Sequence, residues 1–138
     1  MGRVAAAFSV VAVTAVVLLG LGCGDGGEGG SGPTMRPGED CLACHGGGEA
    51  AFSAAGTVFG ADGTAAPGLT VTLVDSLATQ ASATTNSAGN FFFEESLTPP
   101  FQVAITDGTT TVSMPDAAAA CNSCHRAGGA AQAAIVFP

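Results

Sequence analysis

The central part of the chain, residues 56–114, alternates apolar and polar side chains with the two-residue period of half-buried β-strands. The clearest runs lie at 69–74, after a Pro-Gly turn, and at 101–105, after two consecutive prolines. The pattern predicts strands at 57–59, 69–74, 81–85, 91–93 and 101–105, a Thr-rich strand ending at 113, and a last strand at 134–137. We therefore expect an all-β fold, a small antiparallel β-sandwich with Greek-key connections.

The chain before the predicted domain lacks this alternation and divides into two parts. Residues 1–22 begin with one basic residue, Arg3, and continue as an apolar run to Leu19, which is typical of an export signal. A retained transmembrane helix is the alternative, since the run is close to the length that spans a bilayer. Residues 23–38 are rich in Gly and have no apolar pattern, which predicts a flexible linker. The folded domain is expected over 39–138.

Cys23 stands at the junction of signal and linker. The stretch LGLGC at 19–23 resembles a bacterial lipobox, in which a Cys after small residues is lipidated and becomes the new N-terminus. It departs from that motif at Gly20, where Leu is usual. Lipidation of Cys23 accounts for the odd fifth cysteine and favours cleavage over a retained helix. The resemblance implies an exported, lipid-anchored protein of the bacterial periplasm or cell surface, with the outer membrane as the expected location.

The pattern C-x-x-C-H occurs twice, at 41–45 and at 121–125, on either side of the predicted sandwich core. On a short helical turn, positions i, i+3 and i+4 share a face, so two thiols can add to the vinyl groups of a haem while the imidazole binds its iron. The sequence therefore predicts two covalent c-type haems. The thioether bonds are assigned to Cys41, Cys44, Cys121 and Cys124, and the proximal iron ligands to His45 and His125.

Zinc and disulfides are the alternative uses of these cysteines. Two C-x-x-C pairs can form a four-cysteine zinc site, but the gap from Cys44 to Cys121 is much longer than in zinc ribbons, and such a site does not need a His after each pair. A disulfide within C-x-x-C closes a tight, redox-labile loop. A thioredoxin-type motif needs a βαβ setting, which the pattern lacks. We favour haem attachment.

A methionine precedes each haem motif, and a predicted strand follows it. Met35 lies six residues before Cys41, and Met114 lies seven residues before Cys121. With both histidines used, these methionines are the candidate distal ligands, and His/Met ligation raises the potential relative to bis-His ligation. A distal Met upstream of its own motif is unusual and Met is also an ordinary core residue, so an open or water-bound iron is the alternative. If the first and last strands run parallel, both haems lie at the same pole of the domain.

Composition and charge narrow the class of partner. Charged residues make up 10% of the chain and the formal net charge is -8. Phosphate binding needs clustered Lys and Arg, so nucleic acid is excluded as a partner. An acidic electron carrier is steered toward redox proteins with a basic docking face. Contact between the haems of neighbouring chains is a further route to association.

Part of the predicted sandwich resembles a known family. The segments GTVF at 56–59, DG at 62–63, APGLTVTL at 66–73 and TTNSAGNF at 84–91 are similar to the carboxypeptidase regulatory-like, or transthyretin-like, β-sandwich. The resemblance covers less than half of the chain and rests on turn and core residues. It implies the sandwich fold and a structural or adhesive role without catalytic residues, so the function must come from the haem motifs.

The sequence thus predicts an exported, membrane-tethered dihaem c-type cytochrome that transfers single electrons between redox partners and is not an enzyme. A haem enzyme or a gas or redox sensor is the first alternative. It needs an open iron site with polar distal groups, for which only Arg36 and Arg126 are left. A non-haem surface module with zinc or disulfides at the Cys pairs is the second alternative.

Overall fold

The computed structural model describes residue 34 and residues 36–48, 51–131 and 133–138. The predicted export signal, Cys23 and Met35 lie outside these described residues, as does most of the predicted linker. Within the described ranges, no helix is long and apolar enough to cross a membrane.

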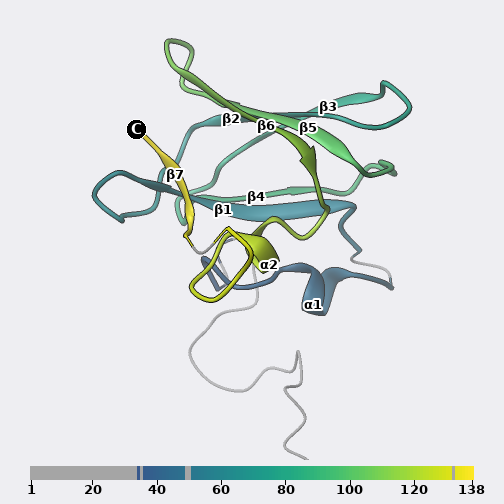
Figure 1. The fold of residues 1–138 in the computed structure, drawn as a ribbon, viewed down its shortest axis with the longest axis horizontal. Coiled ribbons are helices and arrows are strands. Elements are labelled where there is room, and N and C mark those ends of the chain that lie inside the picture. The colour runs from purple at the N-terminus through teal and green to yellow at the C-terminus, as the bar shows by residue number, and fades with distance from the viewer. Residues whose placement is uncertain (1–33, 35, 49–50, 132) are drawn as a thin grey trace, which may run out of the picture.

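Two β-sheets pack face to face and account for most of the domain (Figure 1). The first sheet has the order β4-β1-β7 and consists of β4 (Asn90–Phe93), β1 (Ala54–Gly60) and β7 (Ile135–Phe137). The second has the order β3-β2-β5-β6 and consists of β3 (Gln80–Thr84), β2 (Thr70–Val74), β5 (Phe101–Thr106) and β6 (Thr111–Ala117). Two one-turn helices, α1 (Leu42–His45) and α2 (Cys121–Cys124), lie beside the first sheet. The predicted all-β sandwich is confirmed.

The strands predicted from alternation bury the expected side chains. Val71 and Leu73 of β2 are fully buried, and they pair with Ile105 and Val103 of β5, which face the same core. Thr72 and Ala104, which lie between them, point away from the core, because successive side chains of a strand face opposite sides of the sheet. These two strands form the centre of the four-stranded sheet.

β1 begins three residues before the predicted start, and its burial does not alternate. The first five residues, Ala54 to Val58, are all buried. One face of this central strand packs on the second sheet, and the other is covered near α2, where Ala55 N–H donates to the Ala119 carbonyl at 3.2 Å. A strand that is buried on both faces carries no two-residue signal in its sequence.

Among the named strands of the described residues, every pair but one is antiparallel. β1 and β7 run parallel, with Val58 opposite Ile135 and Gly60 opposite Phe137. A purely antiparallel sandwich was therefore the wrong prediction for this pair, because the chain returns from α2 in the same direction as it leaves α1. The parallel course of the first and last strands is the arrangement that brings both motifs to one pole.

The three phenylalanines of β4 serve both faces of its sheet. Phe91 and Phe93 point into the core and pack edge to face, with ring centroids 6.3 Å apart. Phe92 points to the opposite face and stays half-buried. That outer face of the β4-β1-β7 sheet carries both C-x-x-C-H motifs.

Candidate functional site: two adjacent C-x-x-C-H turns

Both motifs fold as short helical turns, as predicted. His45 N–H donates to the Cys41 carbonyl at 2.9 Å, and His125 N–H donates to the Cys121 carbonyl at 2.9 Å. This i to i+4 bond places each histidine one turn after the first cysteine of its motif. The two motifs therefore have the same backbone closure, and the differences between them come from their surroundings.

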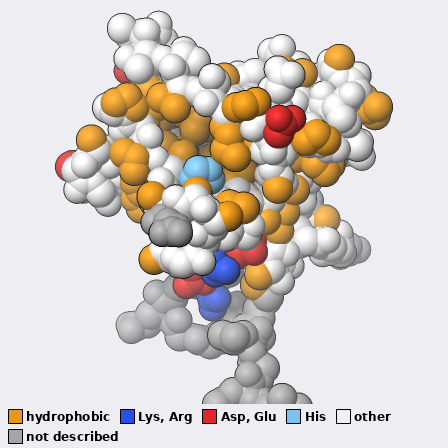
Figure 2. Space-filling view, viewed as in Figure 1, with side chains coloured by type: hydrophobic (Ala, Val, Ile, Leu, Met, Phe, Trp, Pro, Cys, Tyr) orange, Lys and Arg blue, Asp and Glu red, His pale blue; other side chains and the backbone are white. Residues whose placement is uncertain are grey.

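The second motif borders an open, apolar cavity of about 490 Å³. Cys121, Cys124 and His125 line it from α2, and core residues such as Phe91 and Ile105 form its floor. Its other walls come from β6, β7 and the small alanines before β7. Figure 2 shows apolar side chains gathered around a histidine on the face that carries α2 and β7. The volume and the apolar lining are those of a small-molecule or cofactor site.

Met114 faces His125 at this cavity. The Nε2 atom of His125 lies 3.4 Å from the Sδ atom of Met114. Met114 is on β6, an edge strand, and 40% of it is exposed. The contact leaves no room for a metal ion between the two atoms, so ligation by both requires the Met114 side chain to move. A flexible thioether on an edge strand can do this without disturbing the core.

The first motif has an aromatic setting. The His45 ring stacks on Phe52, with centroids 4.4 Å apart and planes 18° apart, and Phe52 stacks in turn on Phe92, at 4.7 Å and 19°. Phe52 N–H also donates to the His45 carbonyl at 2.8 Å. The stack connects α1 to the outer face of β4. It orients the imidazole through ring packing.

The two turns lie side by side on the outer side of the first sheet (Figure 1). The side-chain amide of Asn122 in α2 donates from Nδ2 to the carbonyl of Glu39, two residues before Cys41, at 2.8 Å. Its Oδ1 accepts a hydrogen bond from Thr57 N–H of β1 at 3.0 Å. Both turns therefore lie at the same end of the domain, and the placement of two haems there stays a prediction.

Cys41, Cys121 and Cys124 are free thiols. Burial raises the pKa of Cys121 to about 11, and the nearby Cys41 thiol contributes to this shift. Burial also raises the pKa of Cys41. Both thiols are therefore protonated at neutral pH.

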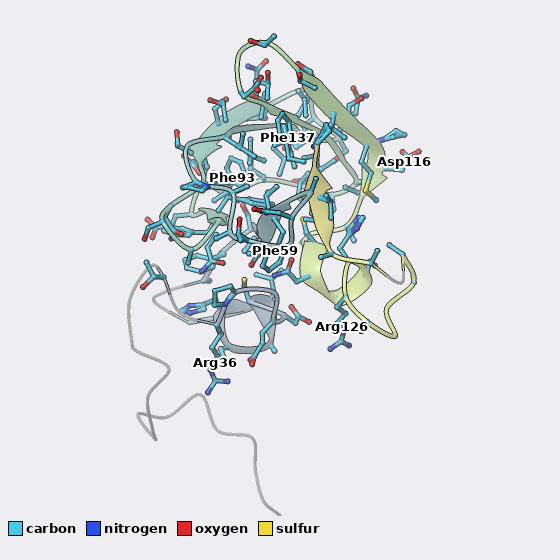
Figure 3. All side chains as sticks on the ribbon, turned by 90° about the vertical axis from the view of Figure 1, so that its left-hand side faces the viewer. Arg36, Phe59, Phe93, Asp116, Arg126 and Phe137 are labelled. Carbon is cyan, nitrogen blue, oxygen red and sulfur yellow. The ribbon has the colours of Figure 1, made fainter. Side chains whose placement is uncertain are left out.

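The two arginines considered as polar distal groups are placed away from the cavity. Arg36 pairs with Glu39, with Nη1 and Oε2 3.4 Å apart, and the Arg126 Nε donates to the Ser123 carbonyl at 3.3 Å. Both point outward at the end of the domain that carries the turns (Figure 3). Among the described residues, no group of three or more His, Cys, Asp or Glu is arranged to hold a metal ion.

Sequence reasoning did not single out Phe52, Phe92, Thr57 or Asn122. Asn122 carried a weak signal, because it is a polar residue at a position where the first motif has Leu42. Phe92 carried none, since the middle of an apolar triplet is as easily assigned to the core. Comparison of the chain with protein-family models, curated proteins and solved structures finds no match.

Proposed function

We propose that this chain is an exported, lipid-tethered dihaem c-type cytochrome that carries single electrons between redox partners. The observation that carries the proposal is the second motif, where two free thiols, the His125 imidazole and the Met114 thioether surround one apolar cavity. Covalent c-type haem needs the two thiols and the histidine at one site, with an apolar surface for the macrocycle, and Met114 adds a candidate distal ligand.

At the second site, Cys121 and Cys124 hold the haem through thioether bonds, His125 is the proximal ligand and Met114 is the distal ligand. The contact between Nε2 of His125 and Sδ of Met114 supports this assignment, because it places both donor atoms on the same cavity. The role of Met114 was inferred from its position before the motif, and the structure adds the proximity.

At the first site, Cys41 and Cys44 form the thioether bonds and His45 is the proximal ligand. The stack of His45 on Phe52 supports the assignment, because it fixes the plane of the imidazole. Met35, the candidate distal ligand of this site, lies outside the described residues.

When bound, each haem supplies an iron centre that gains and loses one electron. The protein contributes the outer face of the β4-β1-β7 sheet, which carries both turns. The formal net charge of -8 suits a redox partner with a basic face. The strand order, with a crossing between the sheets from β3 to β4, supports the finer proposal of a transthyretin-like sandwich with Greek-key connections.

The test is the haem content of the full chain made in a host that has haem-attachment machinery. The purified protein should be red, and its pyridine haemochrome should correspond to two haems per chain. A colourless product with stoichiometric zinc would overturn the proposal. Carbon monoxide binding by the reduced protein at both irons would instead indicate a haem enzyme or sensor with open iron sites.

A further inference from the structure

Asn122 occupies the first variable position inside the second motif, and only 1% of it is exposed. Its counterpart in the first motif is Leu42, and α1 contains no buried residue. A buried primary amide needs partners for both of its N–H groups and for its carbonyl oxygen. The partners of Asn122 therefore show which parts of the chain this residue joins.

All three hydrogen bonds of the Asn122 side chain reach segments far away in sequence. Oδ1 accepts from Thr57 N–H at 3.0 Å, and Nδ2 donates to Thr57 Oγ1 at 3.0 Å and to the Glu39 carbonyl at 2.8 Å. Because a backbone N–H can only donate and a carbonyl can only accept, these partners fix the orientation of the amide. The group is fully satisfied.

Thr57 joins the same network from β1. Its Oγ1 accepts from Gly38 N–H at 2.9 Å and donates to Asn90 Oδ1 of β4 at 2.7 Å. The segment that enters the first motif is thus bonded through Gly38 to Thr57 and through Glu39 to Asn122. Both bonds lie within three residues of Cys41, so they determine where the first turn sits on the sheet.

α2 has attachments that do not use the Asn122 side chain. Ala55 N–H donates to the Ala119 carbonyl at 3.2 Å, and Ala131 N–H donates to the Cys124 carbonyl at 3.0 Å. Cys121 also packs closely on β1, since a Cβ added at Gly56 would lie 3.0 Å from the Cys121 Cβ. Removal of the Asn122 amide therefore takes two hydrogen bonds to Thr57 from the second turn but leaves it these other attachments. The entry to the first turn keeps only the bond from Gly38 to Thr57.

We propose that Asn122, although it belongs to the second motif, is the positioning residue of the first haem. This inference rests on the proposed function. The amide sets the position of Cys41 and His45 relative to the second turn, and so the distance and orientation between the two redox centres. A residue between the cysteines of one motif then controls the neighbouring site.

The haem-loaded test compares Asn122→Ala with Ser123→Ala. Ser123 is the matched control, because its Oγ donates to the Ala120 carbonyl at 2.7 Å within the same turn. Each variant is placed in two single-haem backgrounds, Cys121→Ala with Cys124→Ala and Cys41→Ala with Cys44→Ala. In the background that lacks the second haem, Asn122→Ala should shift the midpoint potential of the first haem. In the background that lacks the first haem, it should leave the midpoint potential of the second haem unchanged. A shift at the second haem alone, or at neither, would overturn the proposal.

The haem-free full chain gives a second readout, which remains valid if the proposed function fails. Alkylation of Cys41 by iodoacetamide, mapped by mass spectrometry, should be about tenfold faster in Asn122→Ala, as expected for the loss of a buried hydrogen bond. Alkylation of Cys121 should change by less than about twofold, and Ser123→Ala should change neither rate. An unchanged Cys41 rate in Asn122→Ala would contradict the positioning role, whereas a wild-type chain that binds no haem would contradict the proposed function alone.

Discussion

The two C-x-x-C-H motifs share a sequence pattern and a backbone turn, but their surroundings differ. The first has no buried residue in its helix, and its histidine packs on a short aromatic stack. The second is anchored on β1 by Asn122, and its histidine faces a methionine across an apolar cavity. One pattern is thus placed in two different environments on the same face of one sheet.

This difference shows which properties a local motif determines. The closing hydrogen bond from His to Cys measures 2.9 Å in both turns, so five residues are enough to fix the turn. The group that contacts each histidine lies outside the motif: Phe52, in the loop that follows α1, stacks on His45, and Met114 of β6 contacts His125. If both motifs carry haem, the two irons should therefore differ in ligation and in potential.

Removal of the Met114 sulfur tests this asymmetry most strongly. In Met114→Leu, the midpoint potential of the second haem should fall by on the order of 0.1 V, within the roughly 0.8 V range of potentials that axial ligands set. The other haem should keep its potential, because its histidine stacks on Phe52. A spectroelectrochemical titration with two resolved components measures this.

Val112→Ala is the control for Met114→Leu. Val112 is on the same strand, lines the same cavity and is 39% exposed, but it has no ligand atom. In Val112→Ala, the midpoint potential of the second haem should be unchanged within the scatter of the titration. Equal shifts in both variants would mean that Met114 acts through packing, and that the second iron has another distal ligand.

The buried thiol of the second turn should be slow to react. Burial raises the pKa of Cys121 from 9.0 to about 11. In the haem-free chain at pH 8, its thiolate is then roughly 100-fold scarcer than that of an unshifted cysteine. The alkylation rate of Cys121 should keep rising up to about pH 11, because burial disfavours the charged form. A plateau near pH 9, as in the chain unfolded in urea, would contradict this environment.

The same pKa shift predicts a loss of stability at alkaline pH. The folded state keeps the Cys121 proton between pH 9 and 11, whereas the unfolded state releases it. Over that interval the unfolded state binds fewer protons, so the free energy of unfolding decreases as pH rises. Cys121→Ser should reduce this decrease in urea titrations of the haem-free chain.

Gly56 tests how closely the second turn packs on β1. A Cβ at this position would lie 2.7 Å from Phe91 Cζ and 3.0 Å from Cys121 Cβ. Gly56→Ala should therefore lower the free energy of unfolding by about 2 kcal/mol through overpacking. Gly47→Ala, in the loop after the first motif, meets nothing within 4 Å and should change it by less than about 0.5 kcal/mol. Equal effects in urea titrations would mean that the two turns are packed alike.

Local patterns were sufficient for much of this structure. Alternation in β2 and β5 located the centre of one sheet, and the repeated motif located both turns. The parallel pairing of β1 with β7 departs from the predicted antiparallel sandwich; the sequence supplied parallel first and last strands only as a condition for placing both motifs at one pole. The features that the sequence did not predict depend on contacts between distant residues. β1 is buried on both faces, so its start has no alternating signal. Asn122 forms hydrogen bonds to residues 65 and 83 positions away.

The smallest expected effect concerns the aromatic stack of the first motif. Phe52→Leu keeps an apolar side chain but removes both ring contacts, with His45 and with Phe92. Stacked pairs contribute about 0.5 to 1.5 kcal/mol beyond their buried area, so the free energy of unfolding should fall by about 1 kcal/mol. The imidazole also loses its fixed plane, so the paramagnetic resonance spectrum of the first oxidised haem should broaden while that of the second stays sharp. Phe92→Leu removes only the outer contact and should leave both spectra unchanged. If Phe52→Leu altered the second haem instead, ring packing at α1 could not be what distinguishes the two sites.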